Sequence, residues 1–122
     1  MYYKDKMALK KIKPPQITDS MISEVVAKIV ETFHPEKIIL FGSHVWGKPK
    51  DWSDIDILVV MDYTEPSSRV AAKISLVAKP RYIPMDILVR TPDEIEQRIK
   101  IGDYFIKRIL TKGRVLYERR VS

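Results

Sequence analysis

The residues with the clearest chemical potential in this 122-residue chain are two aspartates at a fixed distance from a glycine-serine pair. Asp54 and Asp56 follow Gly42-Ser43 after ten intervening residues. The apolar run Lys37 to Phe41 before the glycine predicts a buried strand that ends in a turn. Side chains two apart on a strand share a face, so the two carboxylates can converge on one cation. Hard oxygen ligands favour Mg²⁺ or Mn²⁺.

A third acid, Asp86, stands at the start of a later apolar run, Met85 to Arg90. A carboxylate inside a strand is costly unless it is paired or bound to metal. If the acid-bearing strands are neighbours, three carboxylates can surround one or two metal ions about 3.5–4 Å apart, the arrangement used for in-line phosphoryl or nucleotidyl displacement. The Gly42-Ser43 turn would then meet the phosphates, because its glycine allows close backbone approach and the following N–H groups form an anion-binding helix start.

Each of these features alone has an ordinary structural explanation. A Gly-Ser pair is usually a turn, an Asp-x-Asp pair is common in loops and caps, and a single strand-edge acid such as Asp86 usually faces water. Their occurrence together and in order favours a functional site. The order also argues against a phosphatase with an aspartate nucleophile, in which the pair follows its apolar strand, because here the pair precedes Ile57 to Val60.

Hydrophobic periodicity predicts the elements that must position these acids. Strands and helices alternate along the chain, which predicts an α/β fold with a mixed sheet of about four strands packed with helices. The first expected element is a helix capped by Thr18 or Asp19 that runs through Thr32. The others are strands Lys37 to Phe41 and Ile55 to Met61, a helix over 66–79, a strand Met85 to Arg90, a helix that begins at Pro92 and continues to Gly113, and a strand Arg114 to Glu118.

With these residues in place, the chain resembles the polymerase-beta-like nucleotidyltransferase superfamily, over residues 17–118. Its signature is Gly-Ser, about ten residues, Asp-x-Asp and a later strand-borne acid. The short length and the segment 102–118 are similar to the minimal nucleotidyltransferases of prokaryotes. The resemblance implies that Asp54 and Asp56 hold the metals that bind a triphosphate and that Asp86 activates the attacking hydroxyl. It also implies an antitoxin, paired with a HEPN ribonuclease toxin to which it transfers AMP from ATP.

One departure concerns the residues after the Gly-Ser pair. Family members often carry Arg at the positions of His44 and Trp46. Lys48, Lys50 or the basic C-terminal segment would then have to bind phosphate, with His44 as a weaker donor. Trp46 and Trp52 would either stack on a base or pack beneath the loop, and packing is the commoner role of large aromatic residues.

Composition sets the remaining expectations. At 122 residues the chain is expected to hold a basic arm over 1–15 and a single minimal nucleotidyltransferase domain over 16–122, too small for a separate substrate domain. A partner in a homo- or hetero-oligomer, or a protein substrate, would complete the cleft. The absence of cysteine, of a signal-peptide pattern and of a long apolar stretch favours the cytoplasm.

Positive charge is concentrated at the two ends of the chain. Residues 1–13 carry five bases and one acid, residues 98–120 carry eight bases and two acids, and the whole chain has a net charge of +6.

Three functional hypotheses stay open. The first hypothesis is a Mg²⁺-dependent nucleotidyltransferase that modifies a hydroxyl of a partner protein. The second is a catalytically degenerate antitoxin that acts by binding alone. The third is a nucleic-acid-binding module with basic ends that contact phosphates.

Overall fold

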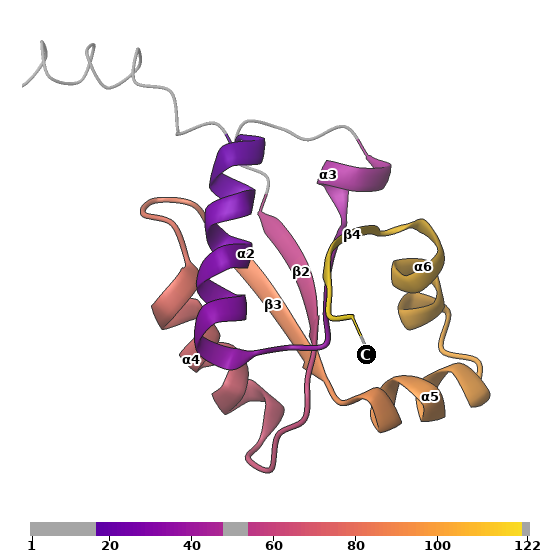
Figure 1. Ribbon diagram of the computed structural model, residues 1–122. Helices are drawn as coiled ribbons and strands as arrows, with labels where there is room; N and C mark the ends of the chain where they lie inside the picture. The colour runs from indigo at the N-terminus through magenta and orange to yellow at the C-terminus, as the bar shows by residue number, and fades with distance from the viewer. Residues whose placement is uncertain (1–16, 48–53, 121–122) are drawn as a thin grey trace, which may run out of the picture.

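The computed structural model describes residues 17–47 and 54–120, which form one four-stranded sheet flanked by helices (Figure 1). The expected basic arm over 1–15 lies outside the described residues, and its separation from the domain stays a prediction. No helix in the described ranges is long and apolar enough to cross a bilayer.

The sheet is mixed, and its strands lie in the order β3-β2-β1-β4. Strand β1 pairs antiparallel with both β2 and β4, whereas β2 and β3 run parallel. This arrangement confirms the α/β class and the mixed sheet of four strands expected from the alternating pattern. The strands are β1 (Lys37–Phe41), β2 (Ile55–Val60), β3 (Met85–Arg90) and β4 (Arg114–Glu118).

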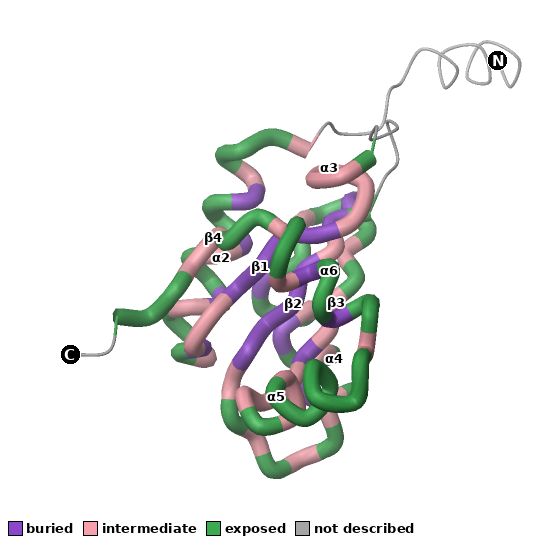
Figure 2. The backbone as a smooth tube through the Cα atoms, turned by 90° about the vertical axis from the view of Figure 1, so that its right-hand side faces the viewer, coloured by how far each residue is buried: buried purple, intermediate pink, exposed green. Residues whose placement is uncertain are grey.

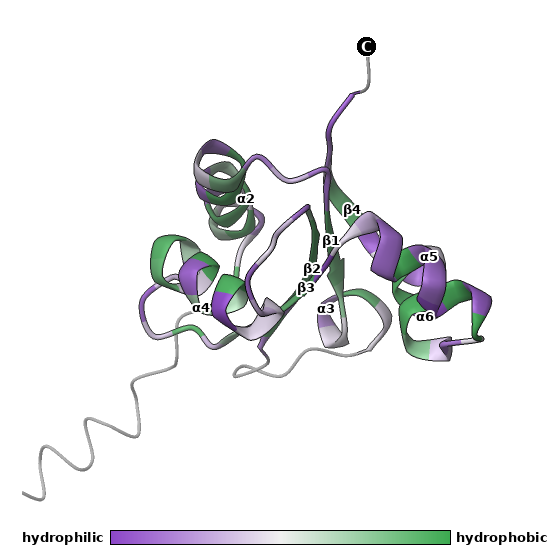
Figure 3. Cartoon of the chain, turned by 90° about the horizontal axis from the view of Figure 1, so that it is seen from below, coloured by the Kyte–Doolittle hydropathy of each residue, from purple (hydrophilic) through white to green (hydrophobic). Residues whose placement is uncertain are grey.

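Helices cover both faces of the sheet and bury a separate apolar cluster on each (Figure 3). Helices α2 (Asp19–Phe33) and α4 (Ser67–Ala78) cover one face, and α6 (Tyr104–Lys112) covers the other. Strand β2 has residues in both clusters, which explains why its sequence is continuously apolar rather than alternating. Figure 2 shows the result, a buried centre of β1 and β2 beneath exposed helices.

Side-chain caps fix where several helices begin. Thr18, one of the two residues expected to cap this helix, accepts a hydrogen bond from the Met21 N–H at the start of α2. At the start of α5 (Pro92–Lys100), Thr91 and Glu94 form a reciprocal capping box. These local bonds satisfy N–H groups that would otherwise have no partner within the helix.

The helix expected to continue from Pro92 to Gly113 is two helices, α5 and α6. Gly102 between them has a φ of +82°, and Asp103 caps α6 by accepting a hydrogen bond from the Ile106 N–H at 3.1 Å. The apolar spacing runs across this break, which is why periodicity alone joined the two helices. The turn lets α6 fold back against the sheet, where Ile106 and Ile109 are buried.

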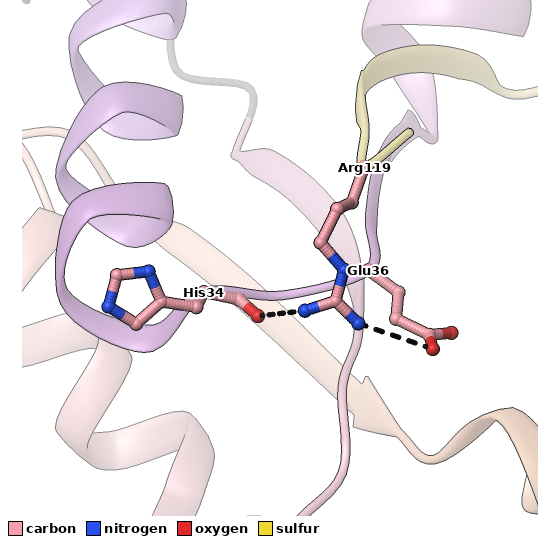
Figure 4. A network of polar contacts seen from close by, with 3 residues as sticks. All are labelled: His34, Glu36 and Arg119. Carbon is pink, nitrogen blue, oxygen red and sulfur yellow. Dashed lines mark hydrogen bonds and ion pairs between the residues drawn. The ribbon is translucent and has the colours of Figure 1, made fainter. Parts of the chain in front are cut away.

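The end of β4 is fastened to the beginning of β1. The backbone N–H of Arg119 donates to the Glu36 carbonyl at 2.8 Å. Its guanidinium donates to the His34 carbonyl and to the Glu36 carboxylate, each at 3.4 Å (Figure 4). These contacts join residues more than eighty positions apart and hold β4 along the outside of β1.

Candidate active site

The two acid-bearing strands are direct neighbours, which meets the condition that the sequence left open. In the parallel pairing of β2 and β3, Asp56 stands opposite Asp86. In the antiparallel pairing of β1 and β2, Phe41 stands opposite Asp56, so Gly42 follows at the same end of the sheet. The fold therefore gathers the Gly-Ser pair and two of the three predicted aspartates at one end of three strands.

Alternation along β2 shows which way Asp56 points. Ile55 and Ile57 belong to the cluster beneath α2 and α4, whereas Leu58 belongs to the cluster beneath α6. Asp56 shares the face of Leu58 because it lies two positions before it. Asp86, in register with it, shares that face, so the two carboxylates lie side by side at the end of the α6 face of the sheet.

Gly42 makes room for the Asp56 carboxylate. Its φ is +82°, a region that favours glycine, and a Cβ at this position would overlap the carboxylate oxygen of Asp56. The carbonyl of Gly42 accepts hydrogen bonds from Val45 and Trp46 at 3.0 Å and starts the short helix α3 (Ser43–Trp46). The glycine of the motif is thus required for both the turn and the approach to the aspartate.

Burial and neighbouring negative charge both act on the Asp56 carboxyl. Partial burial raises the pKa of the Asp56 carboxyl above its ordinary 3.8, and the charges of Asp86 and Asp54 raise the pKa further. His44 acts in the opposite direction and lowers the same pKa. His44 thus lies within electrostatic reach of the Asp56 carboxylate.

Trp46 packs against the protein. Its ring centroid lies 6.1 Å from that of Phe41, and the Arg108 guanidinium of α6 sits 4.3 Å from the ring centroid, a cation–π contact. Phe105 of α6 meets Phe41 edge to face at 5.6 Å. Sequence reasoning missed Arg108 as an individual residue, because nothing local links it to a tryptophan 62 positions earlier.

The sequence profile of the family described as polymerase beta, nucleotidyltransferase matches residues 24–121. The chain belongs to this nucleotidyltransferase family. No curated protein matches its sequence significantly.

Two solved structures resemble this nucleotidyltransferase domain. A crystal structure from Sulfolobus solfataricus, provisionally described as a nucleotidyltransferase, aligns with a TM-score of 0.55 and 20% identity over 82% of this chain and 79% of that chain. A mutant of the toxin–antitoxin MntA-HpeT aligns with a TM-score of 0.49 and 17% identity over 80% of this chain and 74% of that chain. The Sulfolobus likeness supports the shared fold.

The donor set of the nucleotidyltransferase site suits a hard divalent cation, although its ligands are only partly gathered. Within residues 17–47 and 54–120, no three acidic or histidine side chains are close enough together to hold a metal ion. The backbone pairs Asp56 with Asp86, whereas Asp54 is exposed just before β2. Carboxylate oxygens are the ligands that Mg²⁺ and Mn²⁺ prefer. A bound cation would also relieve the repulsion between the carboxylates. The three-carboxylate set itself stays a prediction.

Three of the residues expected to assist phosphate or base binding, Lys48, Lys50 and Trp52, lie outside the described residues. Among those described, Ser43 begins α3 and is half-buried beside Gly42. Arg108 is the cation of the basic C-terminal segment that the fold brings to α3, where it lies on Trp46.

Proposed function

We propose that this chain is a divalent-metal-dependent nucleotidyltransferase that transfers a nucleoside monophosphate to a hydroxyl group. The observation that carries the proposal is the register of Asp56 with Asp86 at the end of the sheet where Gly42-Ser43 turns. Family membership supports the reaction class. The unfavourable charge pair supports a site built for a cation, since like charges at one place lower stability unless a ligand offsets them.

Each residue has a distinct proposed role. Asp54 and Asp56 would hold the cations, which when bound neutralise the triphosphate and polarise its α-phosphorus. Asp86 would accept the proton of the acceptor hydroxyl, whose oxygen forms a bond to the α-phosphorus. The bond from that phosphorus to the oxygen bridging toward the β-phosphate breaks, and pyrophosphate leaves. Gly42 and Ser43 would let the backbone approach the phosphates.

The proposed nucleotide is ATP, and the proposed acceptor is a hydroxyl of a HEPN-type toxin protein. The support for both is the resemblance of the motif to the minimal nucleotidyltransferases.

A second candidate is an antitoxin that neutralises its toxin by binding alone. One observation favours it: Trp46, at a position where relatives often carry Arg, is engaged with Phe41 and Arg108. The chain then has His44 rather than an arginine pair beside the carboxylates, which would weaken its hold on a triphosphate. Binding alone would leave neutralisation intact when both Asp54 and Asp56 are changed to Asn.

The test is transfer of label from ATP to protein in host lysate containing Mg²⁺. The wild type is expected to label one protein when the label is on the α-phosphate and to give no label when it is on the γ-phosphate. Asp56→Asn is expected to abolish labelling. Asp62→Asn, an exposed acid just beyond the other end of β2, is the matched control and should label as the wild type does.

Labelling that persists in Asp56→Asn would reject the assigned site. Labelling from the γ-phosphate would indicate a phosphotransferase instead. If no nucleotide labels any protein, toxin neutralisation is measured with the Asp54→Asn, Asp56→Asn double variant. A double variant that still neutralises the toxin supports the binding-only antitoxin.

A further inference from the structure

Arg108 is an exposed cation of α6 whose contacts set it apart from other arginines near the end of the chain. Its guanidinium lies 4.3 Å from the centre of the Trp46 ring. Within residues 17–47 and 54–120, no carboxylate forms an ion pair with it, whereas Arg98, Arg114 and Arg119 each face one at 4.0, 3.7 and 3.4 Å. An aromatic ring has no lone pair to accept a hydrogen bond, so this contact positions the guanidinium and leaves its N–H donors for an anion.

The contacts of Trp46 place Arg108 on the same face of the sheet as the Asp56 carboxylate. Phe41 stands opposite Asp56 in the antiparallel pairing of β1 and β2, and residues paired in this way have side chains on one face. The rings of Phe41 and Trp46 lie 6.1 Å apart, centroid to centroid, and both pack in the cluster beneath α6. Helices α3 and α6 lie side by side on this face (Figure 3). The guanidinium is therefore separated from the carboxylate by the rings of Phe41 and Trp46.

This face carries opposite charges at two neighbouring places. Asp56 and Asp86 are in register at one of them. At the other, α6 contributes the exposed bases Lys107, Arg108 and Lys112, and its sequence contains no acid. A triphosphate with its metal ion has the complementary distribution, because the cation suits the carboxylates and the remaining phosphate oxygens need positive partners. The planar fork of a guanidinium matches the geometry of phosphate oxygens.

The roles proposed for the aspartates decide which phosphates Arg108 can contact. Asp54 and Asp56 would hold the cations at the α-phosphorus, where the bond to the acceptor forms. Arg108 lies away from that point, beyond two aromatic rings. The base at one end of the nucleotide carries no charge for a guanidinium, whereas the β- and γ-phosphates at the other end gain negative charge as pyrophosphate leaves. A fixed positive group at this place therefore suits the leaving group.

We propose that Arg108, held over Trp46, binds the β- and γ-phosphates of the nucleotide, the part that leaves as pyrophosphate. This inference rests on the proposed function and extends it by naming the residue that recognises the leaving group. It also opposes the weak hold on a triphosphate that the binding-only candidate assumes, because α6 supplies the guanidinium that α3 lacks.

Calorimetric titration of the full chain with ATP and with inorganic tripolyphosphate, in Mg²⁺ and without an acceptor protein, tests the assignment. Arg108→Gln is expected to weaken the binding of both ligands by about tenfold, the effect of one charge-assisted hydrogen bond. Arg108→Lys keeps the charge but loses the fork, so a loss of about threefold is expected. Lys107→Gln removes the adjacent exposed charge of α6 and is the control, expected to stay within about twofold of the wild type. Circular dichroism verifies that these exposed-site variants stay folded.

Trp46 gives a second readout, its fluorescence. The chain has two tryptophans, so Trp52→Phe leaves Trp46 as the only one. Tripolyphosphate is expected to change the emission of Trp46, because the anion binds the guanidinium that lies over the ring. The change at saturating tripolyphosphate should be smaller when Arg108→Gln is added. An unaltered change would show that the anion binds elsewhere and would overturn the contact.

The outcomes separate this inference from the proposed function. If the wild type transfers label and Arg108→Gln binds both ligands as the wild type does, the role of Arg108 is overturned and the transfer reaction stands. If no label is transferred but binding depends on Arg108 as expected, the phosphate contact stands and the transfer reaction is rejected.

Three other results would overturn the role of Arg108. A loss for ATP without a loss for tripolyphosphate would place Arg108 at the base or the sugar. A loss confined to single-stranded RNA of about ten nucleotides would assign α6 to nucleic acid. A wild type that binds neither ATP nor tripolyphosphate would leave Arg108 no phosphate to hold.

Discussion

Replacing Asp56 by Asn should stabilise this protein in the absence of divalent cations. The carboxylate of Asp56 is partly buried and stands in register with Asp86 on the neighbouring strand. Its pKa is raised by that burial, then by the charges of Asp86 and Asp54. The amide of Asn has nearly the same shape and no charge, so the substitution removes the repulsion and retains the packing.

The magnitude follows from the strand spacing. Adjacent strands lie about 4.8 Å apart, so carboxylates in register are about 5 Å apart. Two unit charges at that separation repel by about 1 kcal/mol in water and about 3 kcal/mol at an effective dielectric constant of 20. Asp86 is exposed, so the aqueous value applies. A gain of about 1 kcal/mol in the free energy of unfolding corresponds to about 4 °C in the midpoint of thermal unfolding for a domain of this size.

The gain should depend on pH in a fixed direction. Because folding raises the pKa of Asp56, the folded chain binds this proton more tightly than the unfolded chain. The stability that this bound proton contributes to the folded wild type is fully present below the ordinary pKa of 3.8 and is lost as the pH rises through the raised pKa. Wild type and Asp56→Asn should therefore be similar in stability below pH 3.8 and differ fully near pH 7.

The assay is thermal unfolding of both proteins at pH 7, first with a chelator and then with Mn²⁺ or Mg²⁺. A cation at ten times its dissociation constant should stabilise the wild type by about 1.4 kcal/mol and reverse the order of the two midpoints. Asp62→Asn is the control and should follow the wild type in both conditions. Equal midpoints of wild type and Asp56→Asn in chelator would show that the carboxylates do not repel, and equal cation shifts would show that Asp56 binds no metal.

Two further substitutions test single contacts. Gly42→Ala should lower the free energy of unfolding by about 1–3 kcal/mol more than Gly102→Ala. Both glycines have a φ of +82°, but a Cβ at Gly42 meets the Asp56 carboxylate whereas a Cβ at Gly102 meets open space. The free energy of unfolding is measured in urea, and equal losses in the two variants would contradict the close approach of Gly42 to Asp56. Tyr63→Phe should cost about 1 kcal/mol at pH 7, because the hydroxyl donates to Glu94 at 2.6 Å. This hydrogen bond lowers the pKa of Glu94. The stability that it contributes to the folded chain is therefore present above the ordinary pKa of 4.5 and is lost as the pH falls through the lowered pKa. Tyr104→Phe, at an 85% exposed position, is the control, and a Tyr63→Phe loss that does not shrink in acid would contradict this account.

The sequence by itself determined the elements and the residues that could do chemistry. Period and composition are local properties, so apolar runs located all four strands, and the two cap candidates Thr18 and Asp19 located the start of α2. The Gly-Ser, Asp-x-Asp and later-acid pattern singled out the candidate site for the same reason. Local pattern failed at Gly102, where the apolar spacing continued through a turn that a glycine and an aspartate cap had already encoded.

Only the tertiary structure decided which strands are neighbours. The register of Asp56 with Asp86 and the contact of Arg108 with Trp46 both depend on the strand order. Strand order is set by how all helices and strands together bury two apolar clusters, and no short stretch of sequence contains that information. The chain thus encodes its acids locally, whereas the register of Asp56 with Asp86 is a property of the whole sheet.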